Sequence, residues 1–219
     1  IDVPTLDIQQ HIVNTIGTID DLIENYQNQL INLVILGKSK INALNDTYDI
    51  DLMNNICHFE KGIEIGSKNY LDHFEKNSVH YLRVGDLDNL SSTFIKEELS
   101  KNNANENDVL IALDGAPGRN AIGLKGAFSS GIYKVVCDSK VKGLIYFELN
   151  SKRNQKIISD YSQGTTILHA SKAIQYLEYC KCDLKDIEYF NSLLKMIVEL
   201  KKSISSLKYA KQLLLNKYF

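Results

Sequence analysis

Two long helices, one near each end of the chain, are the feature that most limits how this sequence can fold. In the first, apolar or aromatic residues advance in steps of four and three: Ile12, Ile16, Ile19, Ile23, Tyr26, Leu30 and Leu33. The second repeats this stepping, with one lysine in the series: Leu193, Ile197, Leu200, Ile204, Leu207, Lys211, Leu214 and Tyr218. Such steps place one narrow apolar stripe on each helix, as in a coiled coil, so each helix needs a long and thin partner.

The two helices are the simplest partners for each other. Residues 1–45 carry two basic and five acidic side chains, whereas residues 181–219 carry eight basic and four acidic ones. A domain that leaves the first helix and returns at the second would let them pair antiparallel. The alternative is that each helix packs on the central domain. A helix from Leu6 to Leu44 would be roughly 55–60 Å long, which favours a spacer that holds two things apart.

The central part of the chain has a different pattern. Glycine-containing turns interrupt residues 47–178, and between them lie short β-branched or aromatic runs at 79–84, 109–113, 131–136 and 143–149. Short strands with glycine turns predict a mixed α+β domain with a twisted sheet or partial barrel. The run at 143–149 could be a helix instead, because periodicity does not decide so short an apolar segment. We therefore divide the chain into residues 1–45, 46–180 and 181–219.

Composition excludes several classes of protein. The 219 residues can bury a real core, and no stretch approaches the roughly 20 apolar residues that a membrane span needs. The four cysteines (Cys57, Cys137, Cys180 and Cys182) offer one C-x-C pair and no second pair, so we expect no metal site. Reduced thiols fit a cytoplasmic location.

The net charge of −2 conceals a strong segregation of charge. Residues 57–114 hold six basic and eleven acidic side chains, whereas residues 119–156 hold eight basic and two acidic ones. A basic segment in a nearly neutral chain can present one face to a polyanion such as DNA. The alternative is a solvated loop region that is merely rich in lysine.

Two loops carry side chains suited to nucleic acid. In DVLIALDGAPGRNAIG, residues 108–123, an apolar strand runs into a glycine turn that presents Arg119 and Asn120. The turn lacks the Walker and Rossmann spacings, but arginine and asparagine suit guanine and adenine edges. In GIEIGSKNY, residues 62–70, the loop ends in Ser67, Lys68, Asn69 and Tyr70. Plain surface turns are the alternative at both places.

The sequence gives poor support for catalysis. His58, His73 and His80 are scattered, and neither H-E-x-x-H nor G-x-S-x-G occurs. The chain also lacks a D-P-P-Y or N-P-P-Y motif for base methylation and a glycine-rich adenosylmethionine loop. We therefore predict no catalytic residues and no cofactor.

With these features in view, the chain resembles the specificity subunits of type I restriction-modification enzymes. VPTLDIQQHIV, residues 3–13, is similar to the PPLxEQxxIV motif that opens a helix in this family. Further similar segments are FEKGIEIGSKNY at 59–70, YLRVGDLDN at 81–89 and NDVLIALDGAPGRNAIG at 107–123. The closing helix departs from the motif, since Cys182 stands where the first copy has Pro4. The order of helix, recognition domain and helix resembles the C-terminal half of such a subunit, which runs from the central conserved helix to the C-terminus. We therefore expect either a half-length subunit or the absence of an upstream recognition domain.

The resemblance implies a non-catalytic DNA-reading protein. Residues 46–180 would form a target recognition domain that reads one half of a split site in double-stranded DNA, and the helices would set the distance to the other half. Separate modification subunits, which methylate adenine with adenosylmethionine, and through them restriction subunits, would assemble on the chain. Two copies could also pair through the helices. The residues that we expect to line the DNA face are Lys68, Asn69, Tyr70, Arg83, Arg119, Asn120, Lys125, Lys152, Arg153, Asn154 and Gln155.

A coiled-coil interaction protein that binds another protein, and no DNA, is the alternative function. A salt titration of binding to duplex DNA separates the two, because neutralised phosphates give a steep salt dependence.

Overall fold

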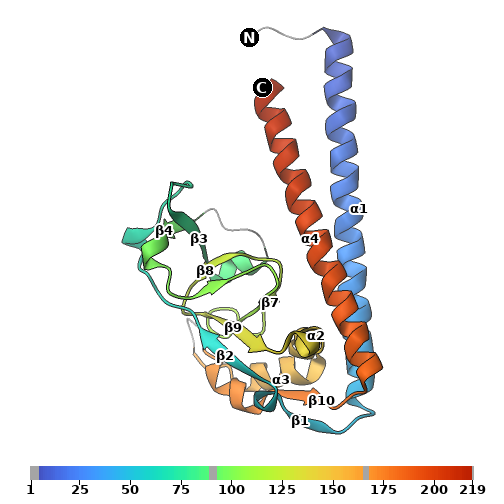
Figure 1. Ribbon diagram of the computed structural model, residues 1–219, viewed down its shortest axis with the longest axis vertical. Coiled ribbons are helices and arrows are strands. Elements are labelled where there is room, and N and C mark those ends of the chain that lie inside the picture. Colours follow the sequence, from blue (N-terminus) through green and yellow to red (C-terminus); the bar gives the residue numbers. More distant parts are fainter. Residues whose placement is uncertain (1–4, 89–92, 165–167, 219) are drawn as a thin grey trace. The chain divides into compact units, whose positions relative to one another are not determined.

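The computed structural model describes residues 5–88, 93–164 and 168–218, except for the side chain of Tyr218 (Figure 1). Residues 3–4 and 89 of the segments quoted above, and residues 165–166 of the glycine-containing turn QGTT at 163–166, therefore lie outside the described residues. The chain divides into a helical unit, residues 1–36 and 195–219, and a central unit, residues 37–194. No helix in the described part of the chain combines the length and the apolar character needed to cross a membrane.

The α-helices are α1 (Leu6–Asn45), α2 (Lys142–Leu149), α3 (Lys152–Asp160) and α4 (Leu184–Tyr218). The strands are β1 (Ile50–Leu52), β2 (Cys57–Lys61), β3 (Ser78–Leu82), β4 (Phe94–Lys96), β5 (Asn103–Ala104), β6 (Val109–Ala112), β7 (Asn120–Ala121), β8 (Gly126–Phe128), β9 (Ile132–Cys137) and β10 (Glu178–Cys180). The α+β class predicted from the sequence is confirmed.

In the helical unit, α1 and α4 run antiparallel (Figure 1). The stripe predicted from the sequence is the less exposed face of both helices, with Ile12, Ile23 and Ile204 buried. Lys211 is the one charged residue of this stripe, and its Nζ donates to both carboxylate oxygens of Asp20, at 2.6 and 2.7 Å. A long side chain can cover apolar surface with its stem and still place its charge at the edge of the seam. The predicted pairing of the two helices is therefore confirmed in this unit.

The central unit contains two four-stranded sheets and one two-stranded sheet. The first sheet has the order β2-β9-β6-β7 and is antiparallel throughout. The second has the order β4-β3-β8-β5, in which β3 and β8 are parallel. Strand β1 pairs with β10 and so brings the start and the end of the central segment together. The predicted runs at 79–84, 109–113 and 131–136 correspond to β3, β6 and β9.

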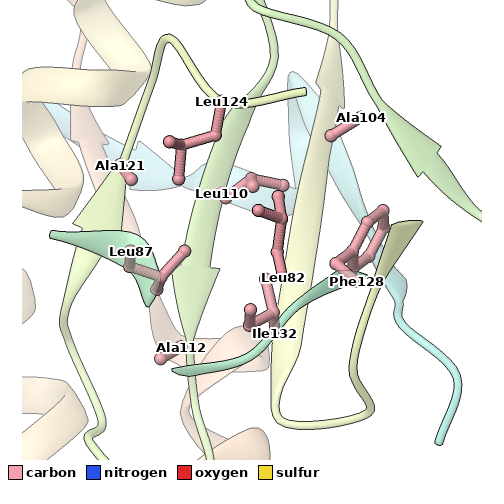
Figure 2. Packing of buried hydrophobic residues seen from close by; sticks show 9 residues of the cluster. All are labelled: Leu82, Leu87, Ala104, Leu110, Ala112, Ala121, Leu124, Phe128 and Ile132. Carbon is pink, nitrogen blue, oxygen red and sulfur yellow. The ribbon is translucent and has the colours of Figure 1, made fainter. Parts of the chain in front are cut away.

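Side chains from both four-stranded sheets share one apolar core. Figure 2 shows Leu82 and Phe128 from the second sheet beside Leu110 and Ile132 from the first. Every residue of β6 is buried, which explains why its sequence is continuously apolar and does not alternate. The strand therefore ends in a rigid core at the point where the glycine turn begins.

The run at 143–149 is the helix α2, so the helical alternative is the one that holds. All its residues from Gly143 to Leu149 are buried, and a helix that is buried on every side shows no apolar period. Gly143 allows the start of α2 to approach α4 closely, since a Cβ there would lie 2.4 Å from the carbonyl carbon of Phe190. The Gly143 amide also donates to Asn191 Oδ1 at 2.8 Å.

Candidate nucleic-acid interface

Arg83 and Tyr70 come together from separate loops. Arg83 begins the short helix η3 (Val84–Leu87), where its amide donates to Asp86 Oδ2 at 2.8 Å. Its Nε lies 3.5 Å from the same oxygen, and its guanidinium carbon lies 5.8 Å from the centre of the Tyr70 ring. Tyr70 donates its hydroxyl to Glu64 Oε1 at 3.0 Å, and partial burial together with this bond raises the pKa of Tyr70. The Arg83 side chain is thus held between a carboxylate and an aromatic ring.

The glycine turn brings a second arginine to the same helix η3. Gly115 and Gly118 have φ angles of 81° and 88°, which suit glycine because other residues rarely adopt them. The turn places Arg119 Nη1 3.3 Å from Asp88 Oδ2 and 3.5 Å from the carbonyl oxygen of Val84. The glycine turn, which is far away in sequence, therefore anchors on residues 84–88, directly after Arg83. We call Tyr70, Arg83 and Arg119, with Asp86 and Asp88, the arginine cluster.

Asp114 contacts two further side chains, those of His169 and Lys61, whose proximity the sequence did not reveal. His169 Nδ1 lies 2.9 Å from Asp114 Oδ1, and Lys61 Nζ lies 3.7 Å from Asp114 Oδ2. The Asp114 side chain is largely buried, whereas those of His169 and Lys61 are more than half exposed. The Gly115 amide donates to Leu168 O at 2.8 Å, so the segment around His169 lies against the glycine turn. A carboxylate directly after a buried strand was the one sequence signal for this site.

The predicted residues on α3 belong mainly to the framework. Asn154 is 0% exposed and hydrogen-bonds the backbone of Glu148 and both backbone groups of Glu178, so it has no free group to offer DNA. Gln155 donates to the carbonyl oxygens of Gly118 and Leu149, and so fixes the glycine turn from behind. Arg153 lies 3.5 Å from a carboxylate oxygen of Glu178. The assignment of Asn154 to an exposed face is therefore corrected.

The predicted asparagines also make internal bonds. Asn69 Nδ2 donates to the carbonyl oxygen of Ile65 at 2.7 Å and so closes its own loop. Asn120 Oδ1 accepts from Asn150 Nδ2 at 2.8 Å. Asn120 Nδ2 is buried and has no hydrogen-bond partner within the described residues.

The predicted lysines differ from the arginines in their surroundings. Lys68, Lys125 and Lys152 are exposed, and their side chains form no ion pair with another described residue. Arg83, Arg119 and Arg153 each pair with a carboxylate of the protein. The structure thus brings together Tyr70, Arg83 and Arg119, leaves three lysines available, and places Asn154 and Gln155 in supporting roles.

Comparison with known proteins adds an independent line of evidence. No family model matches the chain. The chain is 29% identical over 150 residues to the type I restriction enzyme MjaVIII specificity subunit of Methanocaldococcus jannaschii; this match covers 65% of the chain and 34% of that protein. The chain therefore spans about a third of the length of this relative.

Solved structures show the same fold. The S subunit of a type I restriction-modification system from M. genitalium aligns with a TM-score of 0.62 and 17% identity, over 98% of this chain and 61% of that one. The HsdS subunit from Thermoanaerobacter tengcongensis aligns with a TM-score of 0.53 and 16% identity, over 99% of this chain and 59% of that one. In sequence and in fold, the chain is similar to the specificity subunits of type I restriction-modification systems.

Proposed function

We propose that this chain is a DNA-reading specificity component of a type I restriction-modification complex, and that it reads one half of a split site in double-stranded DNA. The arginine cluster is the observation that carries the proposal. Two guanidinium groups pair with carboxylates of one short segment: that of Arg83, which directly precedes the segment and lies beside the Tyr70 ring, and that of Arg119, from the distant glycine turn. Residues 46–180 would be the recognition domain, and residues 1–45 and 181–219 the spacer helices.

The carboxylates of the cluster prepare its arginines for base recognition. A guanidinium group reads guanine through two parallel hydrogen bonds, and this geometry requires a fixed orientation. Asp86 pairs with the guanidinium group of Arg83, and Asp88 pairs with that of Arg119. Each ion pair uses one nitrogen of the guanidinium group and restricts the orientation of the arginine side chain before DNA binds. Three lysines have no carboxylate partner among the described residues: Lys68, Lys125 and Lys152. They suit phosphate oxygens, which accept hydrogen bonds from a lysine ammonium group in many directions.

The chemistry of the complex would lie in other subunits. We propose that the chain itself is not an enzyme and that modification subunits, and through them restriction subunits, dock on it. Exposed apolar side chains on α1, among them Ile31 and Ile35, support such docking. Because its partner is cellular DNA, the chain would act in the cytoplasm. The repeat of the helical pattern at both ends supports a further proposal, that two copies pair about a two-fold axis.

The first test concerns Arg119 and uses a duplex selected from random DNA by the wild-type chain. Arg119→Ala should weaken binding to this duplex by about 1–3 kcal/mol and relax one base position, since it removes a bidentate contact. Arg119→Lys is the matched control: it should keep affinity for scrambled DNA but lose preference at the same position. Fluorescence anisotropy on selected and scrambled duplexes measures both. Wild-type affinity and preference in both variants would place base reading elsewhere.

The second test separates phosphate contacts from base contacts. Lys68→Gln and Lys152→Gln should each weaken binding to all sequences about equally and reduce the slope of log affinity against log salt by about one unit. Lys208→Gln on α4 should leave the slope unchanged. Slopes equal to that of the wild type in the first two variants would show that these lysines face away from DNA.

A further inference from the structure

A pocket of about 440 Å³ opens beside β3 and β8, and of its lining residues the proposed function uses only Lys125. Its lining includes two aromatic rings, from Phe74 and His80, and three polar side chains, from Glu97, Asn103 and Lys125. Aromatic rings next to a cation are typical of sites that stack a nucleobase and neutralise its phosphate. The residue types that line the pocket are therefore those of a nucleotide-binding site.

The aromatic side of the pocket is a fixed arrangement of three rings. His80 and Phe94 are partners across β3 and β4, and their ring centres lie 4.4 Å apart at an angle of 34°. Phe74 meets Phe94 edge-on at 5.9 Å and 76°, and its side chain is 67% exposed. Phe94 positions the Phe74 ring through this edge contact, and the exposure of Phe74 leaves a ring face free to stack with a ligand. Phe74 is thus presented and not buried.

Charge near the rings favours a nucleotide over an apolar ligand. Lys125 is exposed and has no ion-pair partner among the described residues, and it directly precedes Gly126. A Cβ at Gly126 would lie 2.4 Å from the carbonyl oxygen of His80, so glycine allows β8 to approach β3 closely at this point. Lys125 and His80 line the same pocket. Glu97 is the acidic side chain of the lining. As an acceptor it suits the exocyclic amino groups of adenine or cytosine.

We propose that this pocket holds one unstacked nucleotide of DNA, with its base against Phe74 and His80 and its phosphate at Lys125. A base within a paired duplex offers only its edges, because its neighbours cover both faces. A pocket lined by an exposed Phe ring and a His residue therefore fits a base that has left the stack. The inference rests on the proposed function, since it assumes that DNA is the partner.

The absence of tryptophan from the sequence gives a direct test. Phe74→Trp in the full chain introduces a single indole, whose fluorescence should be quenched by a single-stranded tetranucleotide of deoxycytidylate, since cytosine carries the amino group that Glu97 can accept from. Phe74→Ala should weaken binding of the same oligonucleotide roughly 5- to 150-fold, which corresponds to the loss of one stacked base. Because Phe74 is exposed, neither change should alter the melting temperature. Lys125→Gln should flatten the salt dependence by roughly 0.7 unit, the value for one phosphate of a single strand.

Tyr209→Trp on α4 is the matched control, because Tyr209 is equally exposed in the helical unit, and its indole should stay unquenched. Unquenched fluorescence at position 74, with duplex binding still dependent on Arg119, would overturn the inference and leave the proposed function standing. Quenching by free deoxycytidine monophosphate at the same concentration would identify a mononucleotide site and overturn the assignment to DNA. If the wild-type chain binds no DNA at all, the proposed function itself fails.

Discussion

Replacing Ile19 and Ile23 together by Asp is expected to separate α1 from α4 in the helical unit and to reduce the free energy of unfolding of that unit by about 3–6 kcal/mol. Full burial of one Ile side chain stabilises by about 1.5–3 kcal/mol, and a carboxylate in the seam adds the cost of its own desolvation. Ile23 is 9% exposed and Ile19 is half-buried, so both side chains lie in the stripe. Thermal melts followed by circular dichroism, with sedimentation for the oligomeric state, measure the effect.

The same helix offers a matched control with the same spacing. Ile31 and Ile35 are also four residues apart, but they are 54% and 56% exposed. Replacing both by Asp should change stability by no more than about 0.5 kcal/mol per site, as is usual for surface positions. If the two double variants melt alike, or if the seam variant keeps the wild-type helicity and oligomeric state, the stripe does not hold the helices together.

The two long helices could be predicted because apolar residues recur along them with a helical period, which can be read directly from the sequence. Steps of four and three placed Ile23 and Ile204 on the buried face without knowledge of any contact. The strand β6 was recognisable for a different reason, namely a short run of apolar residues that ends in a glycine turn. By contrast, α2 is buried on all sides, so its residues carry no period, and the sequence alone left helix and strand equally open.

The site was only partly predictable, because side-chain polarity does not distinguish a DNA contact from a structural hydrogen bond. The polar segment that contains Asn154 starts a helix: Ser151 accepts a hydrogen bond from the Asn154 amide and so caps α3. Lys125 was chosen for its charge, yet it lines the aromatic pocket and is not part of the arginine cluster. The pairing of Asp114 with His169 joins residues 55 positions apart, and no local pattern reports such a contact.

Glu148 is the least expected buried group in the central unit, and its removal should be strongly destabilising. Its side chain is 0% exposed, and its two carboxylate oxygens accept from different partners. Oε1 accepts from the Cys180 amide at 2.7 Å, and Oε2 accepts from Asn45 Nδ2 at 3.1 Å. These bonds connect α2 with the end of α1 and with β10. The carboxylate therefore holds α2, the last residue of α1 and β10 together within the central unit.

Glu148→Leu keeps the approximate size of the side chain but removes both acceptors. A buried donor left without its partner costs about 1–3 kcal/mol, so the two donors together should reduce the free energy of unfolding of the central unit by about 2–6 kcal/mol. Urea unfolding at neutral pH measures the change. Glu188→Leu on the exposed surface of α4 is the control and should stay within about 0.5 kcal/mol of the wild type. A Glu148→Leu variant as stable as this control would show that the two bonds contribute nothing net.

Glu148 also predicts a dependence of stability on pH. Burial raises the pKa of Glu148 above its ordinary value of 4.5, although its hydrogen bonds and Arg153 act in the opposite direction. Above pH 4.5 the unfolded chain loses this proton first, so the folded chain binds more protons, and stability falls as the pH rises. Protonation of Glu148 contributes its full stabilisation of the folded state below pH 4.5. This contribution is lost as the pH rises through the pKa of Glu148 in the folded chain. Glu148→Gln cannot titrate, so the stability of the wild type relative to this variant should decrease from pH 4 towards neutrality. Urea unfolding of both proteins across this range tests the sign, and a difference that stays constant with pH would mean that burial does not perturb this carboxyl group.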